Sequence, residues 1–284
     1  MNWPILLTIS IITVSLAFLL QRIILKKEES QPVAFAVFEP IISSVFIGAF
    51  TVARGFSFNN FLAIWPNFIL MVAVYGTASV FYYKAVKLIE ASEFTILFTA
   101  RTLFTILGAF LILKERLLPI QIVGAVLIIL SVVIVSSEKK RQKLKFQRGE
   151  VFILLAAGLF GLGFVNDAYI LQRFDATLYL FFAVIMPALG VWITNPKVTF
   201  MAGTIFNRKT LPKVILLSFL YAVSGVTFYL AYQIGRNAAQ ISAFDQLATI
   251  LTVVLAIVFL KESDNLARKI IGTIVSFVGV WLLR

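Results

Sequence analysis

Three charged side chains lie deep inside long apolar stretches of the sequence. They are Glu39, Arg101 and Asp245. A charge at the centre of a membrane helix costs roughly 2.5–3.5 kcal/mol, so each one is expected to face a partner, water or a transported molecule. Arg101 and Asp245 together would suit a zwitterion, whose carboxylate would bind the guanidinium and whose ammonium would bind the aspartate. A purely structural ion pair is the alternative interpretation.

Glu39 comes directly before Pro40, whose ring weakens a helix and leaves a carbonyl group free. A carboxylate beside such a kink could exchange protons with a cavity, which makes Glu39 a candidate for proton coupling. A carboxylate that only reaches toward the membrane surface is the alternative. Tyrosine and threonine hydroxyl groups would suit an organic substrate, although tyrosines in membrane helices often only pack or anchor. These candidate substrate-binding residues are Tyr75, Tyr82, Thr105, Tyr221, Tyr229 and Thr252.

Two similar stretches hold the charged pair. Ala91–Glu115 and Ala238–Glu262 are 147 positions apart, and both end in Leu-Lys-Glu. Each contains an apolar run of about 23 residues, which at roughly 1.5 Å per residue can cross a bilayer as a helix. Arg101 and Asp245 fall on equivalent faces of the two expected helices. Their positions predict an axial gap of roughly 7–8 Å, which is long for direct contact unless the arginine extends.

The composition excludes an ordinary soluble domain. Hydrophobic residues make up 61% of the 284 positions and charged residues 13%, whereas soluble proteins are about 45–50% apolar and about 25% charged. The net charge of +12 comes from lysines and arginines that stand between apolar runs, so we expect no nucleic-acid partner. The sequence has no cysteine and no histidine. Disulfides are therefore excluded, and no metal or other cofactor is expected.

The pattern predicts an all-α integral membrane protein with ten transmembrane helices embedded in the lipid bilayer. A basic segment at 138–150 separates two halves of five spans each, residues 1–137 and residues 151–284. We interpret this segment as a cytoplasmic linker. The expected spans are 3–21, 33–53, 61–83, 91–113, 118–137, 151–171, 177–195, 212–234, 238–260 and 268–283.

The two halves resemble each other at a constant displacement, which indicates duplication. Phe35–Pro40 matches Phe182–Pro187, and Phe81–Tyr82 matches Phe228–Tyr229, again 147 positions apart. Because each half has an odd number of spans, the second half must enter the membrane from the opposite side. The halves are therefore expected to be inverted repeats, with the substrate held near the midplane where they meet.

The same residues carry a family resemblance. In each half the fourth helix ends in Leu-x-Glu, at Glu115 and Glu262, and a glycine opens the fifth, at Gly124 and Gly272. Over nearly the whole chain, this arrangement resembles the EamA-type family of the drug/metabolite transporter superfamily. Family members often have a proline in the fourth helix of each half, fourteen residues before the glutamate, where this sequence has Arg101 and Ala248. The resemblance implies an exporter or exchanger of amino acids, sugars, nucleotides or similar metabolites.

Some polar and small residues near the span ends have simpler expected roles. Glu115 and Glu262 are expected to be solvated or to cap a helix. Asn166 and Asp167 could line the mouth of a cavity, but a solvated helix end is the expectation. A stripe of small residues in the last span could pack inside the protein or form a homodimer contact; it consists of Gly272, Ser276 and Gly279.

Lysine and arginine are concentrated in the loops after the first, third, fifth, seventh and ninth spans. Those loops are therefore expected to be cytoplasmic, with both termini outside. We expect a multi-pass protein of the plasma (inner) membrane that moves a small polar metabolite, such as an amino acid, by alternating access. A lipid-carrier flippase of the same fold is the alternative. An integral-membrane enzyme is disfavoured, because no cluster of residues offers a nucleophile, a base or a metal site, and we assign no catalytic residue.

Overall fold

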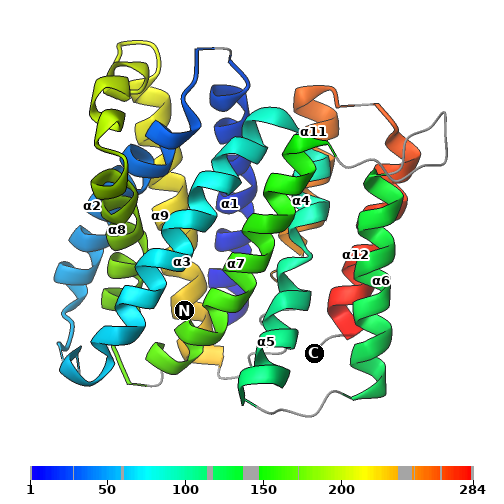
Figure 1. Ribbon diagram of the computed structural model, residues 1–284, viewed down its shortest axis with the longest axis horizontal. Helices are drawn as coiled ribbons and strands as arrows, with labels where there is room; N and C mark the ends of the chain where they lie inside the picture. Colours follow the sequence, from blue (N-terminus) through cyan, green and yellow to red (C-terminus); the bar gives the residue numbers. More distant parts are fainter. Residues whose placement is uncertain are drawn as a thin grey trace.

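The computed structural model describes residues 2–27, 29–58, 61–113, 118–136, 147–171, 173–235, 245, 247–262 and 264–282. Within these ranges the chain is helical and has no strand, as the sequence predicts (Figure 1). The helices are α1 (Trp3–Leu25), α2 (Pro32–Arg54), α3 (Phe61–Leu88), α4 (Ala91–Phe98), α5 (Arg101–Leu113), α6 (Pro119–Ser136), α7 (Arg148–Leu171), α8 (Ala176–Thr194), the 3₁₀ helix η1 (Pro196–Thr204), α9 (Leu211–Gly235), α11 (Leu247–Leu260) and α12 (Leu266–Leu282).

Seven of the described helices are long and apolar enough to cross a membrane, namely α1, α2, α3, α6, α7, α8 and α9. Large apolar side chains on the outside of these helices are exposed, as at Val52 and Ile193. Serine side chains are instead buried inside the bundle, as at Ser10, Ser131 and Ser218. An apolar outer surface around a partly polar interior is the arrangement that a bilayer requires.

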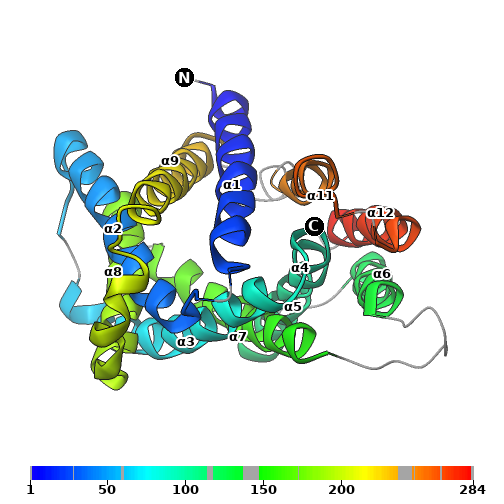
Figure 2. The same ribbon diagram turned by 90° about the horizontal axis from the view of Figure 1, so that it is seen from above.

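Helices of the first half pack against helices of the second half, and corresponding helices make corresponding contacts (Figure 1, Figure 2). α1 packs along α9, and α7, its counterpart in the second half, packs along α3. α2 packs on its own counterpart α8, and α6 packs on its counterpart α12. In Figure 1 the end of α1 lies at the top of the bundle, whereas the end of α7 lies at the bottom. α1 and α7 therefore run in opposite directions.

The predicted span at 91–113 is wrong in one respect, because it is not one continuous helix. Thr99 and Ala100 form a turn, and α5 begins at Arg101. The amides of Thr99 and Ala100 donate to carbonyl groups three residues back, at 3.2 and 3.1 Å. The hydroxyl groups of Thr99 and Thr102 also donate to carbonyl groups three residues back, at 2.6 and 2.9 Å. Such side-chain bonds compete with the helical ladder and bend helices, so the break needs no proline.

Other boundaries differ from the sequence predictions by smaller amounts. α3 continues to Leu88, and α7 begins at Arg148, inside the segment predicted as a linker. The connection between α8 and α9, predicted as a loop, contains the helix η1. The remainder of the predicted linker at 138–146, Glu115 and most of the predicted start of the ninth span lie outside the described residues.

The small-residue stripe of α12 faces α6. Gly272, Ser276 and Gly279 are all buried. A methyl group added at Gly279 would lie 2.9 Å from the carbonyl oxygen of Gly124, and one added at Gly272 would lie 2.6 Å from a methyl group of Val135. The stripe therefore packs inside the protein and lets the two last helices of the repeats approach closely.

Candidate substrate site

Arg101 and Asp245 meet beside the break between α4 and α5. Nη2 of Arg101 lies 3.7 Å from Oδ2 of Asp245. The long arginine side chain thus spans the axial gap expected from the sequence. The contact is too long for a hydrogen bond, and the two side chains keep 45% and 21% of their surface exposed. The pair is therefore accessible, and both groups retain the capacity to bind another molecule.

α7 positions the start of α5. The hydroxyl group of Thr105 donates to the carbonyl oxygens of Arg101 and Gly161, at 3.1 Å each. A methyl group added at Gly161 would lie 2.7 Å from Cβ of Phe104 and 3.0 Å from the amide nitrogen of Thr105. α5 can therefore approach α7 this closely only at a glycine. Thr105, predicted to bind substrate, bonds here to the backbone that holds Arg101 in place.

Aromatic rings surround the guanidinium group. The Cζ atom of Arg101 lies 5.0 Å from the ring centroid of Phe98, a cation–π distance. Tyr82 of α3 and Phe160 of α7 pack edge-on against Phe98, with centroid distances of 5.6 and 5.7 Å. Tyr75 packs on Phe160 at 5.3 Å. Ring contacts therefore link both predicted tyrosines to Arg101, Tyr82 through Phe98 and Tyr75 through Phe160 and Phe98.

The other predicted residues lie further from the pair. Tyr229 packs against the rings of Tyr179 and Phe228, with centroid distances of 6.3 and 5.7 Å. The hydroxyl group of Tyr221 donates to the side-chain oxygen of a glutamine in α1 at 2.5 Å. Thr252 is buried in α11 with 4% of its surface exposed.

Glu39 is the centre of a buried hydrogen-bond network. It is 3% exposed, so it does not reach the membrane surface. Its carboxylate accepts hydrogen bonds from Ser43 at 2.6 Å, from Tyr83 of α3 at 2.7 Å and from Ser218 of α9 at 3.2 Å. Three hydroxyl donors suit an ionised carboxylate, which can only accept. The network links α2 to α3 and to α9.

Asp167 is buried, and the expectation of a solvated helix end is wrong for it. Only 5% of the residue is exposed. The hydroxyl group of Tyr75 donates to its Oδ2 atom. The neighbouring Asn166 side chain accepts a bond from Asn67 at 2.6 Å and donates to its carbonyl oxygen at 3.0 Å. The sequence could not show this burial, because Asp167 lies one turn from the end of α7 and is covered by the distant helices α3 and α8.

Glu262 joins the end of α11 to the start of α4. Its two carboxylate oxygens accept bonds from the amide of Ala91 at 2.9 Å and from the amide and hydroxyl groups of Ser92 at 3.0 and 2.7 Å. The carboxylate thus caps a helix of the other repeat, where the unpaired amides favour a negative charge. Lys269 donates to the backbone oxygen of Glu262 at 3.1 Å and forms an ion pair with Glu90. Of the two expectations, a cap contact is confirmed for Glu262.

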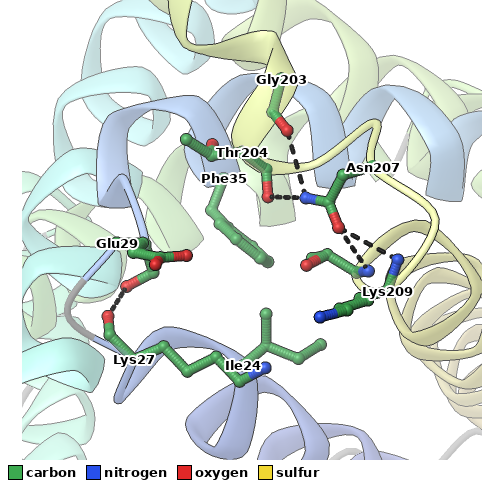
Figure 3. A pocket seen from close by; sticks show the side chains of 10 residues that line it. Ile24, Lys27, Glu29, Phe35, Gly203, Thr204, Asn207 and Lys209 are labelled. Carbon is green, nitrogen blue, oxygen red and sulfur yellow. Dashed lines mark hydrogen bonds between the residues drawn. The ribbon is translucent and has the colours of Figure 1, made fainter.

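A cavity of about 280 Å³ lies elsewhere, between the α1–α2 connection and the segment before α9 (Figure 3). The Asn207 side chain stabilises the backbone at the edge of this cavity. It donates to the carbonyl oxygens of Gly203 and Thr204 and accepts from the amides of Lys209 and Thr210, at 2.9–3.1 Å. The cavity contains none of the predicted site residues. Across the described part of the chain, no three His, Cys, Asp or Glu side chains are grouped to hold a metal ion.

The family comparison agrees with this architecture. The model of the EamA-like transporter family matches residues 1–137 and matches again at residues 147–284. The chain belongs to the EamA-like transporter family. It is therefore a multi-pass membrane transporter of the drug/metabolite superfamily, built from two EamA repeats.

One solved structure, described only as the crystal structure of a protein, shares the fold of this EamA-like chain. It is 15% identical, with a TM-score of 0.58, and the match covers 96% of this chain and 97% of that one. No curated protein matches the chain.

Proposed function

We propose that this EamA-like protein is a secondary transporter that exports or exchanges a small zwitterionic metabolite, such as an amino acid, across the plasma membrane. The observation that carries the proposal is the accessible pair of Arg101 and Asp245 beside a broken helix. Broken helices in membranes occur where the backbone lines a cavity, and many transporters bind their substrates there.

The proposed architecture has ten spans in two inverted repeats that alternate access to one site. α4 and α5 together would form the fourth span, and α11 would form part of the ninth. Support comes from the exchange of packing partners between the halves and from the opposite directions of α1 and α7. Both termini would lie outside, as the distribution of lysine and arginine indicates.

The charges of the pair favour a zwitterion. Arg101 and Asp245 are neutral in sum, and so is a zwitterion, hence binding brings no net charge into the membrane. The carboxylate of the substrate would bind the planar guanidinium group of Arg101, and the ammonium group of the substrate would bind the carboxylate of Asp245. A phosphorylated lipid carrier would instead place negative charge beside Asp245. The rings of Phe98, Tyr82 and Phe160 would contact the rest of the substrate.

The test is counterflow in liposomes that contain the purified protein and unlabelled neutral amino acids. We expect wild-type protein to accumulate a radiolabelled mixture of the same amino acids. Asp245→Asn and Arg101→Gln should lose this accumulation while they still fold. Lys27→Gln, which removes an exposed charge far from the pair, should retain it. Wild-type protein that fails to accumulate amino acids but flips a fluorescent phosphorylated lipid would contradict the proposal.

A further inference from the structure

The end of α7 carries a buried carboxylate that the proposed substrate site does not use. Within the described ranges, the Asp167 side chain accepts a hydrogen bond from the hydroxyl group of Tyr75 to Oδ2. Its Oδ1 atom is buried and has no hydrogen-bond partner among the described residues. The hydroxyl group of Tyr179 on α8 is also buried, with no such partner in the described part of the chain. The two groups lie close to each other.

Among the side chains that the structure describes, none forms an ion pair with Asp167. The carboxylate interacts with Tyr75 of α3 and Tyr179 of α8. Tyr229 of α9 interacts with both of these tyrosines, and Arg101 of α5 interacts with Tyr75. Arg101 itself pairs with Asp245, and Asp167 takes part in no ion pair within the described ranges.

Two of the buried carboxylates, those of Glu39 and Asp167, differ in their hydrogen bonding. Glu39 accepts three bonds from hydroxyl groups, which compensate an ionised group for the loss of water. Asp167 accepts one, so its ionised form would remain poorly compensated at 5% exposure. A proton on Oδ1 removes the charge, which burial penalises and which no ion pair within the described ranges balances. Burial without a counter-ion therefore favours the neutral acid.

We propose that Asp167 holds a proton in this conformation and is the site that couples proton movement to transport. The coupling role rests on the proposed transport function. The proton comes from bulk water, forms one O–H bond at Oδ1 and returns to bulk water when the site opens. No other bond changes. Asp167 lies four residues before the end of α7, roughly 6 Å along the helix, so the path to one membrane surface is short. Tyr75 connects this site to Arg101.

A metal ion is a poorer occupant than a proton. One free carboxylate oxygen and the tyrosine hydroxyl groups fall short of the six to eight oxygens that Ca²⁺ takes. A weakly held Na⁺ would make transport follow a sodium gradient and not a pH gradient. The transport experiment below includes that outcome.

The first test is infrared spectroscopy of the protein in lipid nanodiscs, titrated from mildly acidic to mildly alkaline pH. We expect wild-type protein to show the C=O stretch of a protonated carboxyl group, and the band to disappear as the pH rises. Part of the band should be lost in Asp167→Asn and return at a shifted frequency in Asp167→Glu, whereas Glu39→Gln should leave the band unchanged. A band with full wild-type intensity in Asp167→Asn, or one that Glu39→Gln removes, would overturn the proposal.

The second test uses liposomes that contain the protein and the pH indicator pyranine. An imposed pH gradient should collapse when wild-type vesicles receive a mixture of neutral amino acids. Asp167→Asn should lose this proton flux but still exchange labelled for unlabelled amino acids. A proton flux in Asp167→Asn as large as that of wild-type protein would overturn the proposal, and so would amino acid uptake that requires a sodium gradient. Absence of exchange in wild-type protein would refute the transport function, while the infrared result would still decide the protonation of Asp167.

Discussion

Glu262 is predicted to hold the two repeats together, and Glu262→Gln should destabilise the protein strongly. The carboxylate is 7% exposed and accepts three hydrogen bonds at the start of α4. Glutamine keeps one acceptor but turns an NH₂ group toward an amide of Ala91 or Ser92, so at least one buried donor loses its partner. Bonds to charged groups contribute about 1.5–3 kcal/mol each, and an unsatisfied buried donor costs about 1–3 kcal/mol. We expect a loss of about 3–5 kcal/mol in the free energy of unfolding.

The assay is thermal unfolding in detergent, followed by tryptophan fluorescence and size-exclusion chromatography. Ser92→Ala removes only the hydroxyl bond and should cost about 1–2 kcal/mol, between Glu262→Gln and wild type. Glu29→Gln, at an exposed acidic residue, is the matched control and should change stability by less than about 0.5 kcal/mol. If Glu262→Gln unfolds at the wild-type temperature, the carboxylate does not hold α4 to α11 and the reasoning fails.

Two further predictions concern packing and orientation. Gly279→Ala should lower the unfolding temperature, since overpacking of this kind costs about 1–3 kcal/mol. The control Gly203→Ala adds a methyl group that meets no atom within 4 Å, so it should leave the unfolding temperature unchanged. Equal unfolding temperatures for the two variants would show that α12 does not pack closely on α6. A periplasmic-type alkaline phosphatase reporter fused after Arg284 should be active, because the charge distribution places the carboxyl terminus outside. Activity of a cytoplasmic reporter at the same position would reverse the orientation.

The helices themselves were predictable from the sequence because a bilayer demands long apolar segments. α2 runs from Pro32 to Arg54, one residue beyond the predicted span at each end. α8 begins at Ala176, one residue before its predicted start, where Asp175 caps it through bonds to two amides at 3.0 and 2.9 Å. Proline at a helix start and an aspartate cap are local signals, so the sequence carries them.

The break in the fourth span was not predicted, although the sequence contains a signal for it. No proline interrupts the stretch and its one glycine, Gly108, lies beyond the break, but threonines recur every three or four positions at Thr95, Thr99, Thr102 and Thr105. All four hydroxyl groups donate to backbone carbonyl groups three or four residues back. Such a series competes with the helical ladder at each turn.

The partners of the buried acidic residues could not be predicted, because they come from distant parts of the chain. Asp167 meets Tyr75, 92 positions away, and Glu262 meets Ser92, 170 positions away. Near a span end, a single sequence does not distinguish a solvated carboxylate from one that another helix covers. The pair of Arg101 and Asp245 was identified because both charges interrupt otherwise apolar runs.

The most direct test of the central claim exchanges the two charges, as Arg101→Asp with Asp245→Arg, and compares this double variant with Asp245→Asn and Arg101→Gln. The pair is partly exposed and 3.7 Å apart, so it should contribute little to stability, about 0–1 kcal/mol. We predict that all three variants unfold near the wild-type temperature in detergent, that none shows amino acid counterflow in liposomes, and that the exchange restores nothing. Unstable single variants together with an active exchanged double variant would show a structural ion pair and contradict a substrate site.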